Sequence, residues 1–161
     1  MVPIYIKGEK VILRSVDTSD IDTILLWENS SDNPLYGVYD EQYTREDVVQ
    51  FVENQQRFSL AENEQLRLMV CSHEGERLGC ADLTEYDGNK AFVSILIFDL
   101  DNRGKGLGYD ALRILIPYAK SLGLQALYAN ILPENLPSIS LFKKLCFEAV
   151  DAMLYCKKLS E

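Results

Sequence analysis

The chain has 161 residues, of which 47% are hydrophobic, and a formal net charge of -9. This length suits one domain over residues 1–161, and no apolar run approaches the roughly 18 residues of a transmembrane helix. The acidic balance argues against nucleic-acid binding, which requires clustered Lys and Arg, and it suits either a cationic substrate or solubility alone.

The N-terminal third predicts a strand followed by two helices. The first nine residues lack the basic start and long apolar core of a signal peptide, so a cytoplasmic location is expected. Residues 10–14 alternate as a strand, and residues 19–29 follow a helical period until the breaker residues 29–34. A second helix begins at Thr44-Arg-Glu-Asp47, which has the pattern of a capping box.

The middle of the chain predicts a hairpin and a central strand. Strands at 66–72 and 77–86 are joined by a turn that contains His73, the only histidine, which is therefore expected to be solvated. The four cysteines lack a paired ligand spacing, so no metal site is expected. Residues 91–98 are apolar almost throughout, as in a strand covered on both faces.

The C-terminal part adds two helices and three strands. The helix from 106 contains Pro117, which removes one hydrogen bond and predicts a kink or an early end. Strands and helices follow one another without strict alternation, which predicts an α+β three-layer sandwich with a mixed sheet. The remaining elements are expected at 124–132 (strand), 135–145 (helix), 147–151 (strand) and 153–159 (strand).

A glycine-rich turn joins the apolar strand to the helix at 106. Residues 103–108 read Arg-Gly-Lys-Gly-Leu-Gly, and the three glycines permit a tight turn with uncovered N–H groups. The following helix adds the positive end of its dipole, so the turn is suited to a diphosphate. A P-loop is excluded, because Gly-Lys-Ser/Thr is missing. A dinucleotide fingerprint fits Gly106 to Ala111 but lacks the acidic residue about 20 positions on, so it ranks lower.

This turn and a second run 32 residues later, Asn135-Leu-Pro-Ser138-Ile-Ser-Leu141-Phe142-Lys143-Lys144-Leu145-Cys146-Phe147, resemble the GCN5-related N-acetyltransferases (GNAT). The RimJ/RimL and spermidine/diamine acetyltransferase-like branch is the most similar. The likeness extends over nearly the whole chain. It implies an α/β/α three-layer sandwich whose mostly antiparallel mixed sheet splays between the fourth and fifth strands.

The resemblance also implies acetyl-CoA as the cofactor. The turn would bind its pyrophosphate, the amides at the end of the apolar strand its carbonyl, the later helix its pantetheine arm, and Lys144 its 3′-phosphate. The cofactor-binding residues implied are Leu96, Ile97, Phe98, Arg103, Gly104, Lys105, Gly106, Leu107, Gly108, Tyr109, Asn135, Ser138, Phe142 and Lys144.

The expected reaction is direct transfer of the acetyl group to the primary amine of a small polyamine, another small amine or a peptide N-terminus. A base must first deprotonate the ammonium group, and among Asp82, Glu85 and Asp87 we choose Glu85, near the strand end that faces the substrate cleft. A solvated turn carboxylate is an equal alternative. Phe142 replaces the family's acid tyrosine and Cys146 its glycine, so Tyr128 or water is expected to protonate the thiolate.

Other functions stay open at this stage. The chain is alternatively a weak or non-catalytic acyl-CoA-binding protein, or an enzyme that acetylates ribosomal N-termini. Residues 30–60 would form the substrate-side lid. The expected partners are a small-molecule or peptide amine, without nucleic acid or membrane, and a homodimer is a possible assembly.

Overall fold

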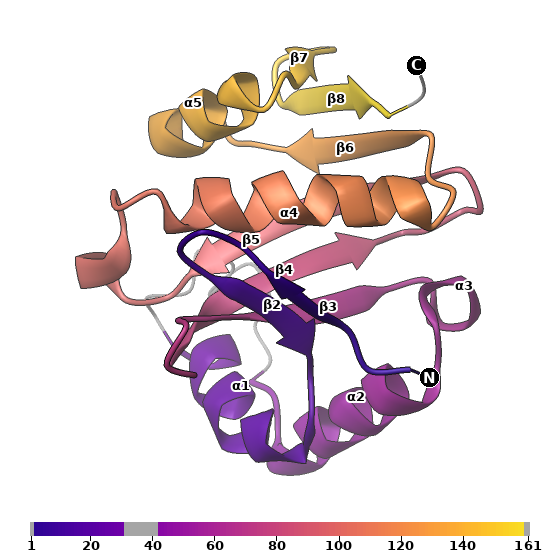
Figure 1. Cartoon of the computed structure of the whole chain (residues 1–161), viewed down its shortest axis with the longest axis vertical. Coiled ribbons are helices and arrows are strands. Elements are labelled where there is room, and N and C mark those ends of the chain that lie inside the picture. The colour runs from indigo at the N-terminus through magenta and orange to yellow at the C-terminus, as the bar shows by residue number, and fades with distance from the viewer. Residues whose placement is uncertain (1, 31–41, 160–161) are drawn as a thin grey trace.

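The computed structural model describes residues 2–30 and 42–159. In this part of the chain, strands form a sheet in the order β1-β2-β3-β4-β5-β6-β8-β7, in which only β5 and β6 pair in parallel (Figure 1). The mixed, mostly antiparallel sheet is thereby confirmed. The strands are β1 (Tyr5–Lys7), β2 (Ile12–Ser15), β3 (Leu66–Cys71), β4 (Arg77–Thr84), β5 (Lys90–Ile97), β6 (Ala126–Asn130), β7 (Glu148–Ala149) and β8 (Leu154–Lys158).

Helices cover both faces of the sheet. One core packs α4 against β3, β4 and β5, and a second packs α1 and α2 against Met69 and Cys71 on the opposite face of β3. The predicted three-layer sandwich is confirmed. No described helix is long and apolar enough to cross a membrane. The helices are η1 (Thr18–Asp20), α1 (Ile21–Glu28), α2 (Arg45–Arg57), α3 (Leu60–Asn63), η2 (Leu100–Asn102), α4 (Leu107–Ser121) and α5 (Leu136–Lys144).

Several predicted boundaries differ from the structure. Helix α4 continues four residues past Pro117, so the predicted early end is wrong. Buried residues lie on both sides of this proline, Leu115 before it and Ala119 after it, and their packing outweighs the lost hydrogen bond. Strand β1 and helix α3 were not predicted, since segments of three and four residues show too little periodicity.

The sheet opens between β5 and β6. Their ladder has the pairs Lys90↔Ala126, Ala91↔Leu127 and Phe92↔Tyr128, whereas β5 stays paired with β4 as far as Ile97. Residues 93–97 of β5 therefore have an open side of about 16 Å, at roughly 3.3 Å per residue. These two strands are the predicted fourth and fifth, because β1 was not counted, and the expected splay is confirmed.

Candidate active site

The glycine turn lies where β5 ends and α4 begins. Gly104 and Gly106 have φ values of 76° and 79°, the left-handed region that glycine adopts without a steric penalty. Gly106 is the N-cap of α4, and no side chain of the described residues caps this helix, although Thr44, Ser59 and Asn135 cap α2, α3 and α5. The first amides of α4 are therefore available to an anionic ligand.

Arg103 fastens this turn to the end of β5. Its Nε donates to the carbonyl oxygen of Ile97 at 2.8 Å, and its Nη2 donates to that of Phe98 at 3.4 Å. The guanidinium group thus holds two backbone carbonyls in addition to any contact with a ligand. The structure gives Arg103 a positioning role that the sequence did not predict.

The strand end presents alternating amides. The amide of Phe98 donates to the carbonyl oxygen of Leu78 on β4, at 3.0 Å. Contrary to the expectation, the splay does not free this amide. Backbone groups in an antiparallel ladder alternate in direction, so the amide of Leu96 also faces β4 and that of Ile97 faces the opening. Of the three expected donors, only Ile97 faces the splay, and Val93 and Ile95 share its direction.

A surface hollow of ≈ 360 Å³ lies beside the turn and joins three parts of the chain. It brings together the predicted residues Gly106, Tyr109 and Lys144 with the cations Lys10 and Arg113, which the sequence analysis missed. Glu9 and Asp110 complete its lining.

Asp110 connects α4 to the turn between β1 and β2. Its buried carboxylate accepts the amides of Glu9, Lys10 and Val11 at 3.3, 2.8 and 3.0 Å, and the guanidinium of Arg113 at 2.7 Å. Burial alone raises the pKa of Asp110, but these donors outweigh it and hold that pKa below its ordinary value. The carboxylate therefore stays ionised and keeps residues 9–11 beside the start of α4.

The other face of the sheet carries a charged cluster. Arg67 lies between two carboxylates: its Nη1 donates to Glu28 at 2.7 Å, and its Nε and Nη2 donate to Asp82 at 2.9 and 2.8 Å. The ring of Phe51 lies 5.0 Å from the guanidinium carbon. Glu28 and Asp82 outnumber the single cation, so this partly buried cluster is acidic.

Two of the carboxylates considered as bases, Asp82 and Glu85, lie at different distances from the end of β5. Asp82 pairs with Ser94, two residues from Leu96, which is about 7 Å of strand. Glu85 lies in the exposed turn after Thr84, whose partner is Phe92, and is therefore more than about 13 Å of strand from Leu96. Asp82 is the carboxylate nearer to the strand end.

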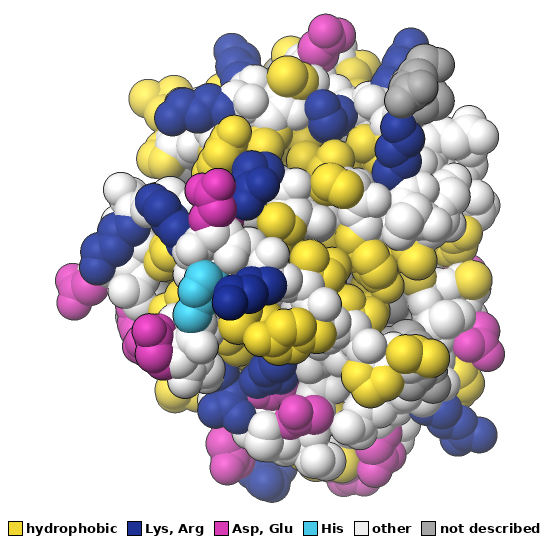
Figure 2. All heavy atoms as spheres, viewed as in Figure 1, with side chains coloured by type: hydrophobic (Ala, Val, Ile, Leu, Met, Phe, Trp, Pro, Cys, Tyr) yellow, Lys and Arg dark blue, Asp and Glu magenta, His cyan; other side chains and the backbone are white. Residues whose placement is uncertain are grey.

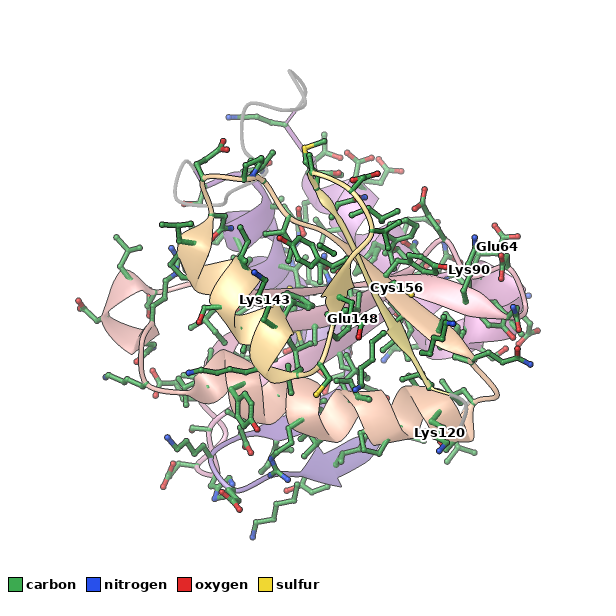
Figure 3. All side chains as sticks on the ribbon, turned by 90° about the horizontal axis from the view of Figure 1, so that it is seen from above. Glu64, Lys90, Lys120, Lys143, Glu148 and Cys156 are labelled. Carbon is green, nitrogen blue, oxygen red and sulfur yellow. The ribbon has the colours of Figure 1, made fainter. Side chains whose placement is uncertain are left out.

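Tyr128 stands at the last ladder pair before the splay. Its ring lies 5.8 Å from that of Phe92, and the ammonium of Lys90 lies 5.2 Å from its centroid. Cys156, labelled with Lys90 in Figure 3, lies opposite Tyr128 on β8, and a side-chain hydrogen bond to it raises the pKa of Tyr128. The phenol is therefore protonated at neutral pH, and it lies where β5 and β6 part.

The predicted residues on and after α5 also have structural contacts. The Oδ1 of Asn135 accepts the amide of Ser138 at 3.3 Å and caps α5, which leaves the Nδ2 of Asn135 for a ligand. Phe142 is buried, and its ring meets that of Phe147 edge-on at 5.0 Å. Cys146 has a φ of 67°, the left-handed conformation that the family's glycine would adopt at this position.

His73 lies at the surface in the β3–β4 turn, as expected, and appears in cyan in Figure 2. Its Nε2 is 3.1 Å from the carbonyl oxygen of Gly8. Within the described ranges no group of His, Cys, Asp and Glu side chains is arranged to hold a metal ion. Of the expected lid, residues 31–41 lie outside the described residues, and residues 45–57 form α2.

A sequence model of the acetyltransferase (GNAT) domain matches residues 10–148, which is most of the chain. The chain belongs to the GNAT family. The matched model describes an acetyltransferase domain, and the splayed sheet and the glycine turn of this GNAT chain belong to that domain.

Curated relatives agree with this assignment. An L-methionine sulfoximine/L-methionine sulfone acetyltransferase of Pseudomonas aeruginosa is 30% identical over 147 residues, which are 88% of this chain and 82% of that protein. A Methanocaldococcus jannaschii protein is 23% identical over 88% of this chain, but the match spans only 29% of that protein's length.

Solved structures share the fold. A GNAT-family acetyltransferase of Bacillus anthracis superposes with a TM-score of 0.76 at 19% identity, covering 98% of this chain and all of that one. The spermidine N-acetyltransferase of Vibrio cholerae, solved with CoA and spermine, also gives a TM-score of 0.76 at 17% identity, covering 92% of this chain and 95% of that one.

The sequence analysis missed the site residues whose contact partners lie far from them in the sequence. Lys10 meets the glycine turn from 95 positions away, and Arg67 meets Glu28 from 39 positions away. Neither residue stands in a recognisable motif. The only local signal was the acidic residue Asp110 directly after the glycine turn, which could have indicated a contact with a neighbouring backbone.

Proposed function

We propose that this chain transfers an acetyl group from acetyl-CoA to a primary amine by direct attack of the amine. The observation that carries the proposal is the opening of β5 on one side, next to a turn whose glycines leave their amides uncovered. A ligand with an anionic end and an extended amide arm fits both features at once, because the turn binds anions and the open strand edge pairs with amides.

The cofactor side is formed by the turn, the strand edge and α5. Amides at the start of α4 would hold the diphosphate, and Val93, Ile95 and Ile97 offer backbone groups to the pantetheine arm. The Nδ2 of Asn135 is available to that arm. Lys144 lines the hollow beside the turn, which supports its predicted contact with the 3′-phosphate. When bound, acetyl-CoA supplies the thioester that the amine attacks.

The acceptor side lies on the face that carries Trp27 and Phe98, which stack at 5.4 Å. Side chains alternate along β5, so Ser94 and Leu96 share this face with Phe98, and Asp82 lies opposite Ser94. An acidic group here favours the approach of a protonated amine and can accept its proton before attack. This placement supports Asp82 as the base, while the role predicted for Glu85 stays a prediction.

Tyr128 would donate the second proton of the reaction, to the thiolate of CoA. Its neutral phenol lies at the point where β5 and β6 part, and it would protonate the departing thiolate. The thiol of free CoA has an ordinary pKa near about 8.5, so water also serves at neutral pH. The tyrosine is therefore expected to accelerate the reaction rather than to be essential.

The acceptor is proposed to be a small amine, a polyamine or a peptide N-terminus. The Pseudomonas aeruginosa relative acts on amino-acid analogues, and the Vibrio cholerae neighbour was solved with a polyamine, so both classes belong in the test. We would incubate the chain with acetyl-CoA and a panel of polyamines, amino acids and short peptides and measure released thiol. Release that rises with one class of amine supports the proposal, whereas tight CoA binding without release favours the alternative of a non-catalytic acyl-CoA-binding protein.

A pair of variants separates the two carboxylates. If Asp82 is the base, Asp82→Asn lowers kcat by about 10²-fold or more and Glu85→Gln changes it little. The reverse pattern would assign the role to Glu85. Because Asp82→Asn also loosens Arg67, circular dichroism and the melting temperature of each variant must be compared before the rates are interpreted.

A further inference from the structure

The side chain of Lys10 reaches over the glycine turn from the connection between β1 and β2. Its Nζ donates to the carbonyl oxygen of Lys105 at 2.8 Å. A Cβ atom placed on Gly106 would lie 3.0 Å from the same Nζ. The ammonium therefore stands directly against the bare backbone of the turn, on the side that a side chain at position 106 would occupy.

The backbone of Lys10 is fixed in this place by the first turn of α4. Asp110 accepts the amides of three consecutive residues, Glu9, Lys10 and Val11. The side chain of Asp110 is 5% exposed, so water competes little for these hydrogen bonds. Helix α4, whose N-terminus adjoins the glycine turn, thus also fixes the position of the Lys10 backbone.

The electrostatics of this arrangement indicate an anion. A cation beside the positive end of a helix dipole is unfavourable on its own, and an anion in contact with both would be stabilised by both. Lys144 and Arg113 line the same hollow, so its lining holds three cations against the two carboxylates of Glu9 and Asp110, on a chain whose net charge is -9. Arg113 is paired with Asp110, which leaves Lys10 and Lys144 as the lining cations without a salt bridge to any described residue.

We infer that Lys10 is a diphosphate-binding residue of the acetyl-CoA site, contributed by the β1–β2 turn. This inference rests on the proposed function, since the diphosphate is that of CoA. Lys10 supplies the charge that the turn's amides lack, while Lys144 on α5 meets the 3′-phosphate. The site is thereby assembled from the N-terminal turn, the glycine turn and α5.

Calorimetry with CoA and with dephospho-CoA, which keeps the diphosphate but lacks the 3′-phosphate, tests this assignment. Lys10→Gln is expected to weaken both ligands by about tenfold, the effect of losing one charge-assisted hydrogen bond. Lys10→Arg keeps the charge and should retain most of the affinity. Lys144→Gln should weaken CoA but leave dephospho-CoA unchanged. Lys158→Gln is the matched control, because it removes the same charge from an exposed site at the far end of β8.

The outcomes are distinct. Equal binding of CoA by wild type and Lys10→Gln would overturn the inference and leave the proposed function standing. A loss seen with CoA but not with dephospho-CoA would also overturn it, since Lys10 would then contact the 3′-phosphate. Absence of CoA binding by the wild type would instead refute the proposed function. In turnover assays, Lys10→Gln should raise KM for acetyl-CoA and leave kcat and the melting temperature unchanged, a split that a purely structural role would not give.

Discussion

Adding one methyl group at Gly106 tests the glycine turn most sharply. Its φ of 79° costs a non-glycine residue about 1–2 kcal/mol, and the new Cβ would meet the Nζ of Lys10 at 3.0 Å. The ammonium is the end of a flexible side chain and can move away at little cost. Gly106→Ala should therefore lower the melting temperature by only about 2–8 °C for a chain of this size. Its methyl group would also occupy the space proposed for the diphosphate, so acetyl-CoA affinity should fall by more than about tenfold.

Gly123 provides the matched control for this experiment. It follows the same helix, has a φ of 89°, and has no atom within 4 Å of its added Cβ. Gly123→Ala should therefore show the same loss of stability without any loss of affinity. The assay is calorimetric titration with acetyl-CoA, with the melting temperature measured on the same samples. Unchanged affinity in Gly106→Ala would show that the diphosphate does not lie against this turn.

Three further changes test separate parts of the site. Tyr128→Phe should lower kcat by about tenfold or more without raising KM for acetyl-CoA, and a pH-independent ratio of unity between pH 6 and 9 would exclude it as the acid. Cys146→Gly should raise the free energy of unfolding in urea by up to about 1 kcal/mol, because it relieves a left-handed φ of 67°; a loss of stability would contradict this reading. Asn135→Ala should raise KM for acetyl-CoA more than KM for the amine, whereas Ser59→Ala, which removes a comparable helix cap, should change neither.

The fold was largely predictable because its long elements have strong local patterns. The apolar residues of β5 and the helical period of α4 each span several repeats, so both appeared where expected. Of the kink or early end predicted at Pro117, the early end is wrong, because the buried face of the helix keeps α4 intact past the proline. Strand β1 was missed because its three residues acquire their conformation from pairing with β2.

The site was predictable where its residues stand in sequence motifs, in the glycine turn and in the run from Asn135 to Phe147. The glycines of the turn predict a left-handed backbone conformation, and Gly104 and Gly106 adopt it. The direction of each amide along β5 depends on the register with β4, which the sequence does not show, and this is why Phe98 was expected to be free. The ammonium of Lys10 and the cluster around Arg67 depend on contacts between distant segments, which no local pattern encodes.

The most direct test of direct acetyl transfer to an amine follows an isotope-labelled acetyl group from acetyl-CoA. With the amine that releases most thiol, the label should appear in the amide of that amine at the rate of thiol release, with none bound to the protein. Recovery of the label as free acetate, as a covalent acetyl-enzyme, or wholly as unreacted acetyl-CoA with every amine would contradict the account.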